Sequence, residues 1–568
     1  MQNSKIIKYL VERNPRGEAQ LSRAKRQIAK KFKLKTLSNI VLLELYRKAI
    51  KNKKIQSNTE LEKLLKTREI RTLSGVAPVA VLTKPYPCPG KCAFCPNEKE
   101  MPKSYLSNEP AVMRAIGSNF NPYKQIRTRI EALTITGHNT DKIELIIMGG
   151  TWSYLETKYQ NWFIKKCFEA MNNSATPPIR GAGGFAGKRN NLIDAMKKNE
   201  KAKHRCVGLT LETRPDYINL KEIKRMRQLG CTKVELGVQA IDDEILKLNK
   251  RGNTVQQIID ATKLLKDAGF KIVYHIMPNL PGSSSAKDVK MYKELFSNPD
   301  FQPDMVKIYP CVVTKNSEIY RWFKKGTYKP YSDKQLFGTL LKMKEATPPY
   351  VRIIRLIRDI PAESIIAGGK ISNLRQNLQK ELTLTGKKCQ CIRCREIKNI
   401  NSKIKNQELK IREYNASGGV EYFLSFEDTE EDKLLAFLRL RIQPRWSLPL
   451  GDSCVLPLSR RSPLAGDSDE AGNVDPTARG VGGSFKIFPE LQDCAIIREV
   501  HTYGELAPVN IKGKVQHLGF GKKLIKKAEE IALENGYKKM AVIAAVGTRG
   551  YYRKLGYRLS GDYMVKNI

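Results

Sequence analysis

Between residues 76 and 315, short apolar runs alternate with segments of helical spacing, and this alternation constrains the fold more than any other feature. Two of the intervening segments, 220–229 and 255–268, repeat apolar residues every three or four positions, as an amphipathic helix does. Strand and helix in alternation predict a parallel sheet. We therefore expect an α/β fold with a partial (β/α)6 barrel, whose chemistry lies at the carboxyl ends of the strands. The expected strands are 76–83, 143–150, 207–212, 233–239, 271–277 and 305–313.

The chain has 568 residues, more than one core accommodates, since cores stop growing at roughly 250–300 residues. A new pattern begins near residue 420: strand-like runs at 434–442, 495–503 and 540–546 with a helix at 519–535 predict a second α/β domain. Stretches rich in Gly, Pro, Ser or Asp are expected to loop out at 179–190 and to form a flexible insertion at 451–483. The predicted domains are a basic helical region at 1–75, the barrel at 76–315, a linker at 316–419 and the second α/β domain at 420–568.

Charge is the strongest signal in the composition. The chain carries 101 Lys and Arg against 57 Asp and Glu, a net charge of +44, and the first 80 residues alone hold 20 basic and 6 acidic side chains. Such a field attracts a polyphosphate backbone, so nucleic acid is the favoured partner, although a host with generally lysine-rich proteins is an alternative explanation. Apolar runs stay far below the ~20 residues of a membrane span, and the first residues lack a signal peptide pattern. We expect a cytoplasmic protein with no membrane partner.

Three cysteines directly after the first expected strand have the spacing of an iron–sulfur ligand set. Cys88, Cys92 and Cys95 are separated by three and two residues, and three thiolates can bind three irons of a cubane while leaving the fourth open. A structural zinc site needs four ligands, so zinc or free thiols remain the weaker alternatives. Gly149 and Gly150 end the second expected strand, where a bare backbone lets a ligand approach closely.

Polar side chains also occur where the other expected strands end. Each is as plausible a satisfied core group as a contact to a cofactor or substrate, but their common position at strand ends favours a shared site. These residues are Glu212, Arg214, Gln239, His275, Lys307 and Tyr309.

The sequence from Gln516 to Gly521 fits a Q-x-x-G-x-G loop that opens a helix. Glycines keep the backbone bare, so N–H groups at the helix N-terminus can hold a pyrophosphate, and the loop resembles the one that binds coenzyme A in GNAT acetyltransferases. A strand before the loop and another after the helix support this interpretation. Tyr551 and Tyr552 follow; they are either ordinary core aromatics or groups beside a thioester.

A second cysteine cluster lies in the expected linker. Cys389, Cys391 and Cys394 offer three thiolates, which do not complete a zinc tetrahedron. Cys311, at the end of the last expected barrel strand, is the fourth ligand that we consider. Structural zinc is the preferred interpretation, and a second iron–sulfur centre or free thiols are the alternatives.

The two motif sets together resemble the catalytic subunit family of Elongator and its single-chain archaeal and bacterial relatives, in which a radical S-adenosylmethionine barrel precedes a GNAT acetyltransferase domain. The resemblance rests on KPYPC, IMGGTW, LETRPDY, ELGVQ, MPNLPG and KIYP, followed by REVHTYG, QHLGFG and GTRGYYRKLGYRL, in the family's order. The gap between Cys88 and Cys92 is shorter than in eukaryotic members. The CQCIRC cluster is not general to the family, and 451–483 has no counterpart that we can assign.

The resemblance implies a chemistry that uses both domains. S-adenosylmethionine at the [4Fe–4S] cluster would be cleaved to a 5′-deoxyadenosyl radical, which takes hydrogen from the methyl group of acetyl-CoA; the resulting radical would add to C5 of the wobble uridine in tRNA, and hydrolysis would leave 5-carboxymethyluridine. Neither carbon is acidic, so a radical cofactor has to carry this step. The implied partners are tRNA, gripped by the basic N-terminal region, and an electron donor. Homo-oligomerisation stays open.

The resemblance also assigns residues. The cluster falls on Cys88, Cys92 and Cys95, and S-adenosylmethionine contacts are expected at Gly149, Gly150, Glu212, Arg214 and Gln239. Tyr551 and Tyr552 are the expected catalytic residues. Acetyl-CoA contacts map onto Lys142, Glu499, Val500, His501, Thr502, Gln516, Gly519, Phe520, Gly521, Lys522 and Tyr552.

Two other functions are compatible with these motifs. A protein lysine acetyltransferase with a purely structural cluster would transfer acetyl groups without S-adenosylmethionine. A tRNA-binding scaffold with degenerate sites would bind tRNA with a steep salt dependence and cleave no cofactor.

Overall fold

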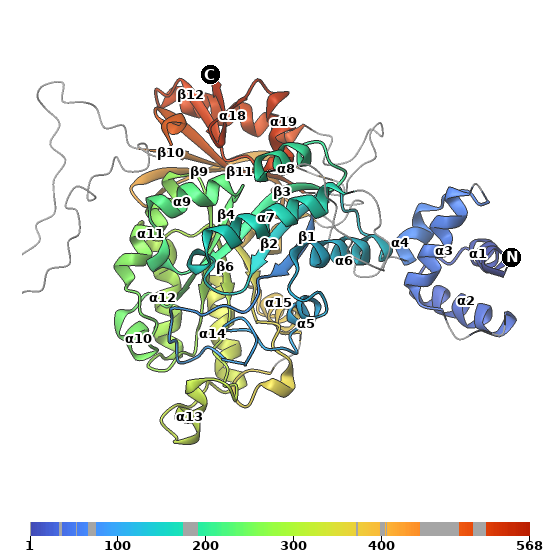
Figure 1. Ribbon diagram of the computed structural model, residues 1–568, viewed down its shortest axis with the longest axis horizontal. Helices are drawn as coiled ribbons and strands as arrows, with labels where there is room; N and C mark the ends of the chain where they lie inside the picture. The colour runs from blue at the N-terminus through green and yellow to red at the C-terminus, as the bar shows by residue number, and fades with distance from the viewer. Residues whose placement is uncertain are drawn as a thin grey trace, which may run out of the picture.

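The first sheet of the molecule is an open barrel of seven parallel strands (Figure 1). The computed structural model describes residues 2–32, 34, 37–52, 54–65, 75–173, 191–370, 373–397, 404, 406–443, 488–503 and 519–568. Strands adjacent in sequence are adjacent in the sheet, in the order β1 to β7, which confirms the α/β class and the partial barrel. The strands are β1 Ala77–Leu82, β2 Lys142–Met148, β3 Arg205–Thr213, β4 Lys233–Gln239, β5 Lys271–Ile276, β6 Met305–Ile308 and β7 Arg352–Arg355.

All six expected barrel strands are present, and β7 adds a seventh. The prediction that the barrel ends at residue 315 is therefore wrong, because β7 pairs in parallel with β6. This strand has only four residues, two of them arginines, so it lacks the apolar run that marks the others. β6 in turn ends before Pro310, which has no backbone N–H to donate to the sheet.

Side chains along the barrel strands alternate between the outer helical layer and the interior, because successive residues of a strand point to opposite faces. On β2, Ile143, Leu145 and Ile147 are fully buried under the helices. The alternate positions Glu144, Ile146 and Met148 line the interior cavity. Charged residues inside an otherwise apolar strand thus mark the inner wall of the barrel.

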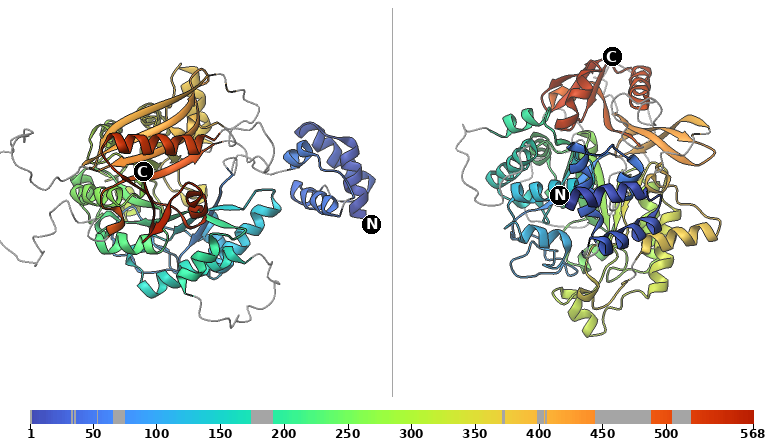
Figure 2. Two further views of the ribbon diagram at one scale, coloured as in Figure 1. Left: turned by 90° about the horizontal axis from the view of Figure 1, so that it is seen from above. Right: turned by 90° about the vertical axis from the view of Figure 1, so that its right-hand side faces the viewer.

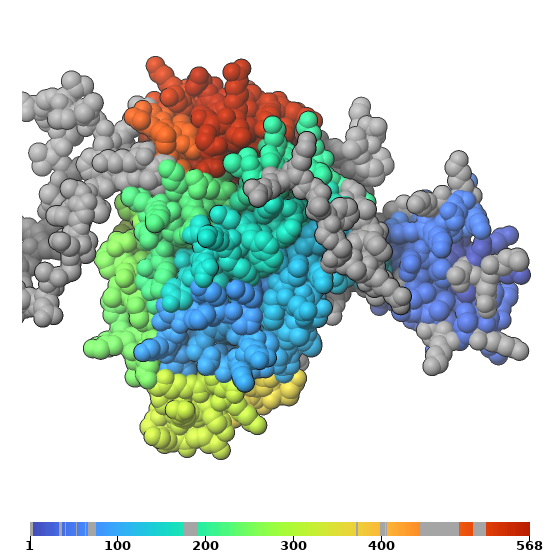
Figure 3. Space-filling model, viewed as in Figure 1, coloured from blue at the N-terminus to red at the C-terminus, as the bar shows by residue number. Residues whose placement is uncertain are grey.

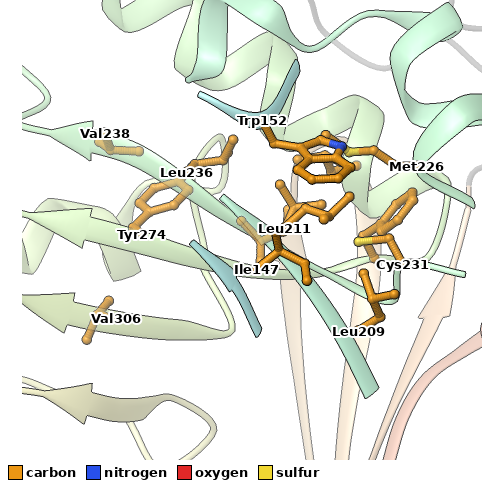
Figure 4. Packing of buried hydrophobic residues seen from close by; sticks show 14 of the residues in the cluster. Ile147, Trp152, Leu209, Leu211, Met226, Cys231, Leu236, Val238, Tyr274 and Val306 are labelled. Atoms are coloured by element: carbon orange, nitrogen blue, oxygen red, sulfur yellow. The ribbon is translucent and has the colours of Figure 1, made fainter. Parts of the chain in front are cut away.

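Helices cover the outer face of this sheet (Figure 1). Close packing in this layer is visible in Figure 4, where Trp152 and Met226 lie over Leu211 and Ile147 of the strands. The segments 220–229 and 255–268 form helices, as expected. The helices around the barrel are α5 Pro110–Ile116, α6 Pro122–Ile135, α7 Thr157–Asn172, α8 Leu192–Asn199, α9 Leu220–Gln228, α10 Asp243–Leu248, α11 Val255–Asp267, α12 Ser285–Ser297, α13 Glu318–Lys324, α14 Asp333–Glu345, α15 Leu374–Leu384 and α16 Ile392–Arg395.

A second seven-stranded sheet, ordered β13-β14-β12-β11-β10-β9-β8, forms the C-terminal domain. Helix α18, Phe520–Glu534, packs against its centre, and α19, Arg549–Arg553, follows β12. The expected strands and helix of this domain are present, although the strand expected at 540–546 ends at Val542. The strands are β8 Gln407–Ala416, β9 Gly419–Asp428, β10 Lys433–Ile442, β11 Cys494–Thr502, β12 Lys539–Val542, β13 Arg558–Ser560 and β14 Tyr563–Asn567.

The C-terminal domain begins earlier than expected. β8 pairs with β9 along its whole length, so the linker does not extend to residue 419. β8 is the edge strand, and its side chains alternate between exposed and half-exposed, which leaves it without an apolar signature. The stretches 179–190 and 451–483 lie outside the described residues.

The basic N-terminal region folds into four helices: α1 Gln2–Arg13, α2 Glu18–Lys31, α3 Asn39–Lys51 and α4 Thr59–Leu65. They pack around their own apolar core, which includes Leu10, Ile28, Leu43 and Tyr46. The left view in Figure 2 shows this bundle beside the barrel, and in the right view it lies in front of the barrel. Among the described residues, no helix is both long and apolar enough to cross a membrane.

Candidate active site

The first cysteine triad lies on the loop that follows β1. Cys92 is buried, and Cys88 and Cys95 are half-buried. Two guanidinium groups face Cys92: Arg251 Nη1 lies 3.5 Å and Arg214 Nη1 4.0 Å from its Sγ. A hydrogen bond from Cys95 and these two cations lower the pKa of Cys92 to about 5, although burial opposes them. A thiolate at neutral pH is the form that binds metal, so the donor set fits the expected cluster.

The end of β2 leaves room for a ligand beside this loop. Gly149 has a φ of +134°, and a Cβ there would lie 2.0 Å from Thr83 Oγ1, so no other residue fits. The hydroxyl of Thr83 is buried and has no hydrogen-bond partner within the described part of the chain. A bare backbone next to a free hydroxyl fits the polar end of S-adenosylmethionine.

Three charged side chains from neighbouring strands are locked together inside the barrel. Glu235 of β4 accepts hydrogen bonds from His275 Nε2 of β5 at 2.8 Å and from Lys307 of β6. Burial alone would raise the pKa of Glu235, but Lys307 and His275 reverse this and hold it well below its usual range. Glu235 in turn raises the pKa of Lys307 against the effect of burial. Tyr309 packs edge-on against His275, with ring centroids 5.5 Å apart.

The expected contacts at the ends of β3 and β4 join this group. Glu212 accepts a hydrogen bond from the Tyr105 hydroxyl at 3.0 Å and lies 3.7 Å from His275 Nδ1. Arg214 is held by Asp216 through contacts of 2.8–3.2 Å and faces Cys92. Gln239 has a φ of +73°, a left-handed conformation that costs a non-glycine residue energy and persists where the surroundings impose it.

In the C-terminal domain, the glycine loop leads into α18 as expected. Gly519 caps the helix in the left-handed conformation, with a φ of +71° that favours glycine. Gly519, Gly521 and Lys522 line a cavity, while Phe520 is buried below them. This places the N-terminus of the helix at the cavity wall. Gln516 lies outside the described residues.

Strand β11 presents an open edge to the same cavity. It pairs with β10 as far as Thr502, but its described pairing with β12 stops at Ile497. Beyond that point Glu499, Val500, His501 and Thr502 line the cavity. Nε2 of His501 is buried and lacks a hydrogen-bond partner among the described residues, and burial lowers the pKa of this imidazole. An open strand edge with an unpartnered polar atom fits an extended ligand with amide groups.

Tyr551 and Tyr552 stand on α19 at the cavity wall, with ring centroids 5.3 Å apart. Burial raises the pKa of both phenols, so both hydroxyls keep their protons at neutral pH and can donate. A Cβ on Gly521 would lie 3.1 Å from the Tyr551 hydroxyl, which puts that hydroxyl beside the glycine loop.

One cavity of about 1510 Å³ connects the two sets of residues. Cys95, Glu212 and Gln239 line it at the carboxyl ends of the barrel strands, and Glu499 and Tyr552 line it in the C-terminal domain. The connection runs through the barrel along the inward-facing strand positions. The first of these on β2 is Lys142, whose pKa is lowered by burial.

Family models match both halves of this arrangement. The model described as the Radical SAM superfamily matches residues 86–295, the Radical_SAM C-terminal domain matches 303–383, and the acetyltransferase (GNAT) family matches 481–557. A tRNA uridine(34) acetyltransferase of Methanocaldococcus infernus is 45% identical over 523 residues, covering 89% of this chain and 88% of the relative. Elongator complex protein 3 of Homo sapiens is 35% identical over 587 residues, covering 99% and 96%.

The chain belongs to the Elongator complex protein 3 family. A solved structure of archaeal Methanocaldococcus infernus Elp3, lacking residues 1–46, aligns with a TM-score of 0.68 at 41% identity, covering 88% of this chain and all of that one. The radical S-adenosylmethionine barrel and the GNAT domain expected from the sequence are thus confirmed.

The two domains of this family member are joined by a buried ion network. Arg498 of β11 binds Asp304 at 2.5 Å and Glu421 at 2.8 Å, and Arg441 binds Glu421 at 3.2 Å. Lys266 lies 3.6 Å from Glu421 without forming a hydrogen bond in the described structure. All five side chains are fully buried. The network fixes the GNAT sheet on the barrel and so keeps the cavity continuous.

The second cysteine triad lies in the linker, at the start of α16. The Sγ atoms of Cys389, Cys391 and Cys394 lie within 4.8 Å of one another, compatible with a tetrahedral ion, whose sulfurs stand roughly 3.8 Å apart at zinc–sulfur bonds of about 2.3 Å. Cys311, the expected fourth ligand, is not part of this group; its thiol hydrogen-bonds with Tyr328 instead. β6 ends at Ile308, before Cys311, whose backbone N–H donates to the Pro278 carbonyl at 2.9 Å.

Several residues at the site were not identified from the sequence. Glu235 accepts a hydrogen bond from His275 and Tyr105 donates one to Glu212 inside the barrel. Arg251 lies against the Sγ of Cys92. The signal for Glu235 was present, because a carboxylate inside the run KVELGVQ faces the barrel interior. Tyr105 and Arg251 lie on loops, where spacing carries no information.

Proposed function

We propose that this Elongator complex protein 3 family member modifies the wobble uridine of tRNA, adding the two-carbon unit of acetyl-CoA at C5 to leave 5-carboxymethyluridine. The observation that carries the proposal is the single cavity lined by cluster-side and acetyl-CoA-side residues. A lysine acetyltransferase with an unrelated cluster would need no such connection. The substrate class comes from the relatives named tRNA uridine(34) acetyltransferase.

At the barrel end, Cys88, Cys92 and Cys95 would hold a [4Fe–4S] cluster, with Gly149, Gly150, Glu212, Arg214 and Gln239 around S-adenosylmethionine. When bound, this pair supplies a 5′-deoxyadenosyl radical, which is able to take hydrogen from an unactivated methyl group. Arg251 and Arg214 offset the negative charge of the Cys92 thiolate in a buried place.

At the GNAT end, the helix N-terminus after Gly519 would hold the pyrophosphate, and the open edge of β11 would pair with the amides of the pantetheine arm. A coenzyme A molecule bound in this way would extend its thioester toward Lys142 and the barrel interior. The protonated phenol of Tyr552 would donate a proton to the departing thiolate when the thioester is hydrolysed.

We assign tRNA binding to the basic N-terminal helices, whose exposed cations suit a phosphate backbone. An electron donor has to supply the reducing equivalent. For the second triad we propose a structural zinc ion on Cys389, Cys391 and Cys394, with a fourth ligand other than Cys311.

The test is anaerobic incubation of the reconstituted protein with tRNA, reductant, S-adenosylmethionine and acetyl-CoA, followed by nucleoside mass analysis. We expect 5-carboxymethyluridine from the unaltered protein and none from Cys92→Ala, while tRNA binding survives. Cys494→Ala, which removes a thiol that hydrogen-bonds to the Glu490 carbonyl, is the matched control and should retain the product. Acetyl-lysine without modified uridine would indicate a lysine acetyltransferase. Binding of tRNA with no cofactor cleavage would indicate a scaffold.

A further inference from the structure

The loop that carries the first cysteine triad is covered on its outer side by two elements with no role in the proposed chemistry. Ala93 N donates to Asn249 O at 3.0 Å, just after α10, and Ile319 N of α13 donates to Ala93 O at 3.1 Å. Asn97 N donates to Asn316 O at 2.8 Å, just before α13. The main chain between Cys92 and Cys95 therefore bonds directly to both elements.

These two elements are tied to each other and present cations to the solvent. Lys250 Nζ binds Glu318 Oε1 at 2.5 Å, which joins the end of α10 to the start of α13. The exposed cations on and beside the two elements outnumber this one carboxylate, and the acidic residues of α10 lie at its opposite end, at 242–244. The exposed cations are Lys91, Lys247, Lys250, Lys315, Arg321, Lys324 and Lys325, which we call the α10–α13 surface.

An apolar side chain stands among these cations. Leu248, the last residue of α10, is 48% exposed and is flanked by Lys247 and Lys250. An apolar centre with a charged rim is the composition of a protein–protein contact. In Figure 3 the cysteine loop in blue, the neighbouring green region and α13 in yellow-green adjoin on one face of the molecule.

We propose that the α10–α13 surface docks a small acidic electron-transfer protein that reduces the cluster. The inference rests on the proposed function, which requires one electron for each cleavage of S-adenosylmethionine. In the step, the donor's iron–sulfur or flavin centre loses one electron and the cubane gains it, and no bond forms between the proteins. Electrostatic steering onto a small contact gives fast, reversible encounters, which suits a donor that has to leave after each transfer.

RNA is the other anionic partner of this protein, but the geometry favours the donor. The surface lies at α10 and α13, away from the N-terminal helices α1–α4 in Figure 1. Its direct backbone bonds run to the cysteine loop. An exposed leucine serves protein contact better than phosphate contact.

The experiment measures cluster reduction in the full-length, cluster-reconstituted protein by stopped-flow absorbance, with a reduced acidic ferredoxin or with dithionite as the reductant. The variant Lys247→Glu/Lys250→Glu/Arg321→Glu should slow reduction by ferredoxin at least about tenfold at low salt. Its rate with dithionite, which needs no docking surface, should stay within about twofold of the unaltered protein. Added salt should slow only the ferredoxin reaction of the unaltered protein.

A control of equal charge change is Arg23→Glu/Arg26→Glu/Lys30→Glu on the exposed face of α2. We expect it to weaken tRNA binding and leave both reduction rates unchanged, whereas the α10–α13 variant leaves tRNA affinity unchanged. The proposal is overturned if ferredoxin reduces the α10–α13 variant at the normal rate, if both variants slow it equally, or if the α10–α13 variant loses tRNA affinity instead. Absence of cofactor cleavage with dithionite would contradict the proposed function rather than this surface.

Discussion

The barrel holds its two neighbouring domains in opposite ways. The GNAT domain is attached through fully buried ions, with Arg498, Asp304 and Glu421 in direct contact. The N-terminal helices meet the barrel at an exposed position, where Arg47 Nη1 donates to Thr134 O at 2.9 Å. The side chain of Arg47 is 36% exposed and is also paired with Glu62 of its own domain.

The difference corresponds to the roles that we propose for the two domains. Two cofactor pockets that share one cavity have to keep a fixed relative position, because reacting atoms have to come almost into contact. A domain that binds the phosphate backbone of a large RNA gains more from freedom to move than from a fixed position. We infer that the buried interface with the GNAT domain serves the chemistry, and that the exposed contact with the N-terminal helices serves the capture of tRNA.

Breaking the buried interface should have the largest effect. In Arg498→Met, Asp304 and Glu421 stay buried without their main cation, so we expect a loss of about 3–5 kcal/mol in the free energy of unfolding, measured by urea titration and circular dichroism. Arg553→Met is the control, because Arg553 pairs with Glu200 across the same two domains but is 45% exposed, and it should cost less than about 1 kcal/mol. Equal losses in the two variants would contradict the difference between buried and exposed contacts.

Removing Lys266 should have a smaller effect. Its ammonium is buried and makes no hydrogen bond within the described structure, so Lys266→Met should raise the free energy of unfolding by about 1–2 kcal/mol at neutral pH in the same titration. Lys263→Met on the same helix, at a partly exposed pair with Asp267, should change the free energy of unfolding by less than about 1 kcal/mol.

The pH dependence of stability in Lys266→Met gives a further test of the buried interface. Burial lowers the pKa of Lys266 to about 8 from its ordinary 10.5, although Glu421 and Asp304 oppose the shift. The folded protein thus binds this proton less tightly than the unfolded chain, and protonation penalises folding below pH 8. The penalty disappears as the pH rises from 8 toward 10.5, so the unaltered protein should gain stability relative to Lys266→Met over that range. A constant difference would show that Lys266 titrates normally.

Removing the exposed contact between the N-terminal helices and the barrel should have the smallest effect on stability. Arg47→Ala removes an exposed pair and one backbone contact, so it should change the free energy of unfolding by less than about 1 kcal/mol. A loss as large as that of Arg498→Met would mean that the N-terminal helices are rigidly docked.

The fold was predictable where the chain is buried on both sides and unpredictable at edges. The inner barrel strands are apolar runs and were found, whereas the four-residue β7 and the half-exposed β8 carry no such pattern. Ligand sets on one short segment, such as Cys88, Cys92 and Cys95, were readable because their spacing alone fixes the geometry.

Contacts between distant segments were not predictable. Arg439, Arg441 and Arg498 stand out as charges inside apolar strands, but nothing in the sequence pairs them with Asp304 or Asp267. The continuity of the cavity depends on how the two domains dock, and no motif encodes that. The assignment of Cys311 to the second triad failed for the same reason.

The central claim is that both cofactors react in one cavity, and a deuterium transfer experiment tests it most directly. The reconstituted protein would be incubated anaerobically with tRNA, dithionite, S-adenosylmethionine and acetyl-CoA that carries three deuterium atoms on its methyl group. We predict 5′-deoxyadenosine containing one deuterium, together with carboxymethyluridine that retains two. Modified uridine accompanied by 5′-deoxyadenosine without deuterium would contradict direct transfer between the two pockets.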